Sequence, residues 1–458
     1  MRRPTAALVL LLDLCFAAVG CAATRSAPPG TEARVADRTT ALAVDSALTA
    51  MGASPLWPGF APLATPLALF DGERTYLFRH PAPPAGYSAV PGRSDAVVRE
   101  GRDPAVTANS SALLGGVPTA TVILDTRSGT QQAAALTVHE LFHVFQRAKH
   151  PSWQGNEADL FTYPVEDSAA LALRREETFA LARAVGARTD DSLRCWAGAA
   201  LDARRRRFAL VGAAAGAYER GTELNEGLAQ YVERRAAGTT SALDAVDLPP
   251  AQVRQRSYVV GAALAGVLDR VRPGWRDLLE HDPDGATLPL DSLLAGSLSG
   301  TPSRPCSVEP TQRARWAVGA GNDVRALLAE RTRTLDEYLG RGGWRVIVDA
   351  RTAPFFPAAF DPLNVVRLSE TEILHTRFLK LRGQLGSIDV LSARALTEGG
   401  AGAHPLFAGV RRVTLAGLTS LTVHDSAGTL AVDASGVTVR LHGTRADTTD
   451  RTILIHPR

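Results

Sequence analysis

The segment TVHELFHVFQ, residues 137–146, combines a helical pattern with the spacing of a metal site. His139 and His143 are four residues apart, so on a helix both imidazoles lie on one face, with Glu140 beside them. The pattern H-E-x-x-H therefore predicts a helix that presents two metal-binding side chains and a carboxylate together. The apolar residues in and beside the segment also favour a helix: Leu136, Val138, Phe142 and Phe145.

Two histidines at this spacing, with a glutamate next to the first, are typical of catalytic zinc sites. Zinc in such a site takes three protein ligands and leaves one position for water. The ion lowers the pKa of that water, and the glutamate takes a proton from it as it attacks a carbonyl. We therefore expect His139 and His143 to bind Zn²⁺ and Glu140 to act as the general base. The alternative is a pair of surface histidines on an ordinary helix.

The third ligand distinguishes the classes of zinc peptidase that share this pattern. One class continues as H-E-x-x-H-x-x-G-x-x-H, but here Gln146 and Lys149 occupy the later positions and His150 is one residue out of phase. The sequence therefore disfavours that class. The other class takes a glutamate from a later helix.

The segment LNEGLAQYVE, residues 224–233, supplies a candidate for that glutamate. It resembles the zinc-ligand helix of aminopeptidase-N-type gluzincins, in which L-N-E-G-[FL]-A-x-Y-[VL]-E surrounds the liganding glutamate. The resemblance implies that Glu226 is the third ligand. Glu219 and Glu223 are fallbacks, since they could share a helical face with Glu226, and Glu166 is a weaker alternative.

A second resemblance lies in SYVVGA, residues 257–262. The same peptidases carry S-Y-x-K-G-A, whose tyrosine hydroxyl stabilises the oxyanion, so the resemblance implies this role for Tyr258. A phenol suits the role because it donates a hydrogen bond to developing negative charge. Val260 stands where lysine is usual, which makes the motif partial and leaves a tyrosine that only packs as the alternative.

Together these motifs resemble those of gluzincin metallopeptidases, the group of thermolysin and aminopeptidase N, over roughly residues 118–270. The gap of 82 residues between His143 and Glu226 exceeds the short gap of the aminopeptidases, and an inserted helical pair at roughly 160–215 could fill it. The chain has no G-x-M-E-N segment, which holds the free amine in that family, so aminopeptidase specificity is not implied. The resemblance also implies that the strand at 118–125 is the sheet edge that pairs with an extended substrate.

The N-terminus has the features of a secretory signal. Arg2 and Arg3 precede an apolar run over 6–19, and the small residues before Cys21 resemble a bacterial lipobox. The resemblance implies a signal peptide over 1–21, a lipid anchor on Cys21 in the bilayer, and a place in the cell envelope. We expect an outer-membrane lipoprotein that faces the periplasm or the surface, with simple secretion as the alternative. Cys195 and Cys306 would then either pair or remain buried thiols.

The remaining patterns predict an α+β protein. Residues 22–117 form a tether and an N-terminal α+β region, 118–341 a zincin-like metallohydrolase domain with a largely helical second half, and 342–458 an all-β domain resembling a sandwich or small barrel. The expected elements, in chain order, are a helix at 38–51, a hairpin around Asp71-Gly72, a strand at 118–125, a helix at 131–150, helices through 160–240, a helix from Ser257 to near Pro273, loops at 281–310 and a helix at 321–340.

Charge gives no reason to expect nucleic acid as a partner. The net charge is +3, and the run RRRR at 204–207 is expected to be a solvated helical face. The expected function is that of a cell-envelope zinc metallopeptidase that hydrolyses a peptide or protein substrate. The alternatives are a catalytically silent zincin-fold surface protein and a zinc hydrolase that acts on a non-peptide amide or ester.

Overall fold

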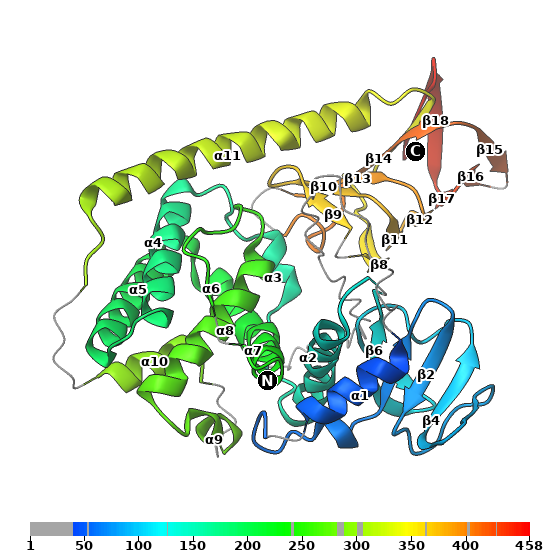
Figure 1. Ribbon diagram of the computed structural model, residues 1–458. Helices are drawn as coiled ribbons and strands as arrows, with labels where there is room; N and C mark the ends of the chain where they lie inside the picture. Colours follow the sequence, from blue (N-terminus) through cyan, green and yellow to red (C-terminus); the bar gives the residue numbers. More distant parts are fainter. Residues whose placement is uncertain are drawn as a thin grey trace, which may run out of the picture.

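The computed structural model describes residues 40–458 except for 53–54, 126, 240–241, 282–287, 300–305, 362–363, 401–403 and 427. The expected signal peptide, the lipid-anchor residue Cys21 and the tether up to residue 39 lie outside the described residues. A sheet near the N-terminus, a helical middle and a β region near the C-terminus follow one another along the chain (Figure 1). This arrangement confirms the α+β class.

The N-terminal sheet has the strand order β3-β4-β2-β1-β6-β5. The hairpin expected around Asp71-Gly72 is confirmed, because β1 and β2 pair antiparallel on either side of it. The expected edge strand is wrong, since β6 is hydrogen-bonded to β1 on one side and to β5 on the other. The edge strands of the sheet are β3 and β5, and β5 is the one next to β6. The strands are β1 (Leu67–Phe70), β2 (Arg74–Phe78), β3 (Ser88–Val90), β4 (Arg93–Glu100), β5 (Ser110–Leu114) and β6 (Val117–Ile123).

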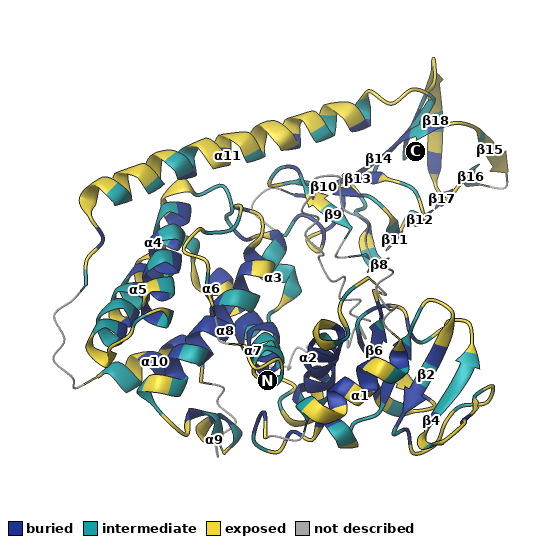
Figure 2. Ribbon diagram, viewed as in Figure 1, coloured by how far each residue is buried: buried dark blue, intermediate teal, exposed yellow. Residues whose placement is uncertain are grey.

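Two helices, α1 (Ala41–Met51) and α2 (Thr130–Lys149), pack against one another, and α2 also packs against β6 and β5. Leu141 and Phe142 of α2 are fully buried in one core with Val122 of β6. Figure 2 shows that α2 is buried over most of its length, unlike the long α11. Apolar burial thus fixes the helix that carries the H-E-x-x-H pattern.

The helical region extends over residues 157–298, with α4 and α5 as the helical pair expected between the two motifs. The helix expected from Ser257 begins earlier, at Val253, and the loop expected at 281–310 contains α10. The helices, with one short 3₁₀ turn before the sheet, are η1 (Pro62–Ala64), α3 (Glu157–Phe161), α4 (Ser168–Val185), α5 (Asp190–Val211), α6 (Ala213–Thr222), η2 (Glu223–Gly227), α7 (Leu228–Ala236), α8 (Val253–Val271), α9 (Trp275–Glu280), α10 (Leu290–Leu298) and α11 (Pro310–Leu339).

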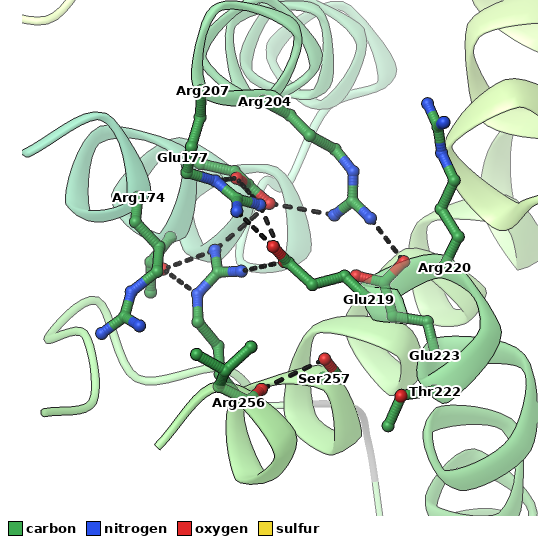
Figure 3. A network of polar contacts seen from close by, with 12 residues as sticks. Arg174, Glu177, Arg204, Arg207, Glu219, Arg220, Thr222, Glu223, Arg256 and Ser257 are labelled. Carbon is green, nitrogen blue, oxygen red and sulfur yellow. Dashed lines mark hydrogen bonds and ion pairs between the residues drawn. The ribbon is translucent and has the colours of Figure 1, made fainter. Parts of the chain in front are cut away.

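A buried network of arginines and carboxylates joins these helices (Figure 3). The expected solvated face at 204–207 is wrong for two of its residues, because Arg204 and Arg207 are only 2% and 1% exposed. Arg207 Nε donates to Glu177 Oε2 at 2.8 Å and its Nη2 to Glu219 Oε2 at 2.9 Å. Burial alone would raise the pKa of Glu177, but the neighbouring arginines, Arg207 foremost, outweigh it and lower the pKa. Glu177 therefore stays ionised away from water.

The network extends to the segments that carry the other motifs. Arg204 donates to Glu223 in η2, and Arg256, two residues before Tyr258, lies 3.2 Å from Glu177 and 3.1 Å from Asp247. Ion pairs thus connect α5 to η2 and α4 to α8. Buried charges are tolerated only when they are paired, so these contacts restrict how the helices can pack.

The C-terminal region is a β-sandwich. One sheet has the order β18-β19-β7-β14-β13-β10-β9 and the other β15-β16-β17-β12-β11-β8, and both contribute to one apolar core. The strands are β7 (Trp344–Asp349), β8 (Phe356–Phe360), β9 (Val365–Arg367), β10 (Glu372–His375), β11 (Phe378–Gly383), β12 (Gly386–Leu391), β13 (Ala395–Glu398), β14 (Arg412–Leu418), β15 (Leu421–Ser426), β16 (Thr429–Ala434), β17 (Val437–His442), β18 (Thr444–Thr449) and β19 (Thr452–Pro457).

Two links hold the ends of α11, which begins at Pro310 rather than at the expected residue 321. Near its start, Cys306 forms a disulfide with Cys195 of α5. Of the two alternatives for these cysteines, the structure therefore shows the pair and not two buried thiols. Near its end, the Tyr338 hydroxyl donates to the Thr414 carbonyl of β14 at 2.8 Å. Among the described helices, none is long and apolar enough to cross a membrane.

Replacing Arg207 by methionine should lower the free energy of unfolding by about 3–5 kcal/mol, because two buried carboxylates lose their partner. The control is Arg205→Met, which removes a side chain that is 77% exposed on the same helix and should change the value by about 0.5 kcal/mol or less. Urea denaturation measures both. Equal effects of the two substitutions would contradict a stabilising role for the network.

Candidate metal centre

Helix α2 places three polar side chains of the H-E-x-x-H pattern in the interior. His139, Glu140 and His143 are 5%, 3% and 7% exposed, although all three can ionise. The apolar contacts of α2 with the sheet and with α7 fix this face of the helix. Polar groups placed out of water need partners, so the surroundings of these three residues show what the site can hold.

The candidate for the third metal ligand, Glu226, comes from η2, a single π-helical turn between α6 and α7. Glu226 Oε2 lies 3.2 Å from His143 Nε2 and 3.5 Å from His139 Nε2. One ligand atom from each of these three residues lies within 4.8 Å of the others. The structure therefore brings together His139, His143 and Glu226 as a buried group able to hold a metal ion.

The other ring nitrogen of each histidine is held by a hydrogen bond. His139 Nδ1 is 3.0 Å from Glu233 Oε2, and His143 Nδ1 is 2.8 Å from Gln146 Oε1. Both acceptors favour a proton on Nδ1, so the Nε2 atom of each ring faces Glu226 and can bind a metal ion once it is deprotonated. Metal-binding histidines are usually oriented in this way by a partner on the opposite nitrogen.

The charges around the group favour a cation. Burial alone would lower the pKa of His139, but the Glu226 and Glu233 carboxylates that face its two ring nitrogens outweigh it and raise the pKa to about 10. Burial would likewise raise the pKa of Glu226, but His143, His139 and Arg254 lower it well below its usual value. The site thus holds an ionised carboxylate and attracts positive charge, whether a proton or a metal ion.

Two carboxylate oxygens in the site lack a well-formed hydrogen bond within the described residues. Glu226 Oε2 and Glu140 Oε2 are both fully buried and accept no well-formed hydrogen bond from any residue in the described part of the chain. An ionised oxygen left this way is costly unless a cation or a bound water approaches it. The donor set of two imidazole nitrogens and one carboxylate oxygen therefore fits a metal ion at Glu226. Burial raises the pKa of Glu140, despite the opposing effect of both histidines, which suits a carboxylate that accepts and returns a proton.

Tyr258 of α8 lies beside the same group. Its ring is nearly parallel to that of His139, with centroids 6.1 Å apart and an interplanar angle of 14°. Burial raises the pKa of the Tyr258 hydroxyl, and the Glu226 carboxylate raises it further. The phenol therefore remains a protonated hydrogen-bond donor at the edge of the site.

Two glycines allow η2 and α8 to meet closely enough for this arrangement. A Cβ added to Gly227 would lie 2.6 Å from Gly261 Cα, and one added to Gly261 would lie 2.8 Å from the Glu223 carbonyl oxygen. No larger residue fits without moving one backbone from the other. The glycines of the segments 224–233 and 257–262 thus set the distance between Glu226 and Tyr258.

The remaining candidates lie elsewhere. Glu219 and Glu223 pair with Arg207 and Arg204 in the buried network, and Glu166 pairs with Arg331. These three are thus engaged outside the histidine pair. His150 contacts Glu280 at 3.0 Å and stacks on Trp153.

Gln146 is a part of the site that the sequence did not indicate. Besides accepting from His143, its Nε2 donates to the carbonyl oxygens of Leu224 and Asn225, both at 2.9 Å. One side chain therefore orients a histidine and ties α2 to the turn that carries Glu226. Its place three residues after His143, on the same helical face, was the available signal.

Replacing Gln146 by alanine should weaken the binding of a divalent ion by about 10–100-fold, the usual effect of losing a partner of a metal-binding histidine. Competition with a chromophoric chelator, with Zn²⁺ as the probe, measures the affinity. Gln132→Ala, which removes an exposed glutamine from the first turn of α2, is the matched control. Equal affinity of the two variants would show that Gln146 does not orient the site.

Comparison of the chain with protein-family models, with curated proteins and with solved structures finds no match.

Proposed function

We propose that the protein is a zinc-dependent hydrolase of the gluzincin type that cleaves peptide bonds in the cell envelope. One observation supports this proposal most directly: His139 and His143 meet Glu226, which comes much later in the sequence, in the interior with Glu140 beside them. A purely structural zinc site would have no need of Glu140, a buried carboxylate of which one oxygen accepts no hydrogen bond from the described residues. The residues and their order agree with the gluzincin resemblance.

The donor set favours Zn²⁺ over Mg²⁺ and Ca²⁺. Two ligand atoms that are each about 2.1 Å from a tetrahedral zinc lie about 3.4 Å apart, and Glu226 Oε2 lies 3.2 and 3.5 Å from the two imidazoles. Imidazole nitrogen with one carboxylate oxygen is a common zinc set, whereas Mg²⁺ and Ca²⁺ prefer oxygen ligands only. When bound, zinc supplies Lewis-acid chemistry that polarises a carbonyl and makes water acidic.

The other side chains have roles that follow from their surroundings. Glu140 takes the proton of the attacking water and later returns it to the leaving amine, because its carboxylate is buried beside the two histidines and one of its oxygens has no hydrogen-bond donor among the described residues. Tyr258 donates its hydroxyl proton in a hydrogen bond to the oxyanion of the tetrahedral intermediate. β5 is an edge strand of the sheet and packs against α2, so it offers a strand with which an extended peptide can pair.

The proposed location outside the cytoplasm depends on the signal and lipobox pattern ending at Cys21. The disulfide between Cys195 and Cys306 supports it, because such bonds persist in oxidising compartments. We therefore place the enzyme in the outer membrane as a lipoprotein. The sheet and the two metal-binding helices would form a zincin-like unit, and the β-sandwich would extend it.

Changing Glu140 to glutamine should lower peptidase activity by about 10²–10⁴-fold, since the proton acceptor is lost, while zinc stays bound because the three ligands remain. A fluorogenic peptide library and metal analysis of the purified variant measure the two quantities. Glu100→Gln, at an 80% exposed position of β4, is the control.

Each other outcome has a definite meaning. Unchanged activity in Glu140→Gln would refute the mechanism. A wild-type protein that holds zinc and cleaves esters or small amides but no peptide would indicate a different zinc hydrolase. One that holds zinc and cleaves none of these would indicate a zincin-fold binding protein.

A further inference from the structure

The second oxygen of the Glu226 carboxylate is held by an arginine from α8. Arg254 Nη2 donates to Glu226 Oε1 at 2.8 Å, and Asn225 Nδ2 approaches the same oxygen at 3.4 Å. Oε2 is the oxygen that faces both imidazoles. We infer that Arg254 is a positioning residue that restricts Glu226 to binding the metal through Oε2 alone.

Arg254 is itself fixed from the opposite side. Its Nη1 donates to Glu157 Oε1 at the start of α3, and the Tyr218 hydroxyl donates to Glu157 Oε2 at 3.4 Å. The side chains of Arg254 and Glu157 are 17% and 20% exposed, so the contacts are largely shielded from water. One guanidinium therefore joins two carboxylates from different elements through different nitrogens.

The planar fork of arginine is what this arrangement requires. A guanidinium presents its donors at fixed angles, so it can contact both carboxylates while holding the plane of Glu226. A lysine ammonium would supply the charge but not the fixed pair of directions. Charge and orientation at Glu226 can thus be separated by experiment.

The position of Arg254 also links the ligand to the candidate oxyanion donor. Arg254 and Tyr258 are one turn apart on α8, and the guanidinium carbon lies 6.0 Å from the centre of the Tyr258 ring. The close approach of Gly227 and Gly261 brings this helix against η2. Arg254 therefore connects Glu157 of α3 to the carboxylate of Glu226.

The loss of Arg254 should free Oε1 and let the carboxylate rotate. The metal would then be bound by a less ordered ligand or by both oxygens, which changes affinity and coordination number. Partners of metal ligands typically contribute 10–100-fold to metal affinity. The contact of Glu157 with Arg254 predicts a smaller effect in the same direction when Glu157 is changed.

The test rests on the zinc site proposed above and uses the full chain. Zn²⁺ affinity is measured by competition with a chromophoric chelator, and the visible spectrum of the Co²⁺-loaded protein reports coordination number. The variants are Arg254→Ala, Arg254→Lys and Glu157→Gln. Arg270→Ala is the matched control, because Arg270 lies on the same helix and pairs with an exposed aspartate, Asp190. Circular dichroism checks that each variant is folded.

We expect Arg254→Ala to bind zinc about 10–100-fold more weakly than wild type and to show an altered Co²⁺ spectrum. Arg254→Lys should recover part of the affinity but not the wild-type spectrum, and Arg270→Ala should match wild type in both. If Arg254→Ala does not fold, the spectrum of Arg254→Lys and the affinity of Glu157→Gln decide the question.

Wild-type affinity and spectrum in the Arg254 variants would overturn the inference while leaving the proposed hydrolase in place. Zinc binding that depends on Arg254 in a protein that cleaves no peptide would refute the proposed function and support the inference. A wild-type chain that binds no zinc would overturn both.

Discussion

The carboxylate of Glu226 lies in the interior, where one oxygen faces the imidazoles of His139 and His143 and the other accepts from Arg254. An ionised carboxylate is costly away from water unless positive charge or donors surround it. The three elements that supply this surrounding are α2, η2 and α8, and each is held in place by apolar packing. The surroundings of Glu226 Oε2 therefore depend on how these three elements pack.

The buried arginine network complements this site on the other side of η2. In a regular helix Glu219, Glu223 and Glu226 would lie near one face. In the structure the first two contact Arg207 and Arg204, whereas Glu226 contacts the histidines. The π-helical turn over 223–227 changes the direction of the residues that follow it, as such turns often do at functional sites. Of these three acidic residues, two therefore belong to the arginine network and one to the histidine pair.

The helix pair α4 and α5 carries Arg204, Arg207 and Glu177, the centre of the network. Arg204 and Arg207 of α5 contact Glu177 of α4 (Figure 3). The same network reaches Glu223 of η2 and Arg256 of α8. Because each charge is paired several times, moving one helix would leave others unpaired. The residues between the segments 137–146 and 224–233 therefore include two helices, α4 and α5, that support the site.

The sequence by itself determined α2 and the joint presentation of His139 and His143, because a spacing of four residues on a helix is a local property. It also indicated Glu226 through the residues around it and the α+β class through the change in pattern along the chain. It placed the edge strand at β6 and left Arg204 and Arg207 in solvent, since neither strand order nor helix packing is encoded locally. Only the tertiary structure decided which oxygen of Glu226 faces the imidazoles and which partners orient them, because Gln146, Glu233 and Arg254 reach the site from three different helices.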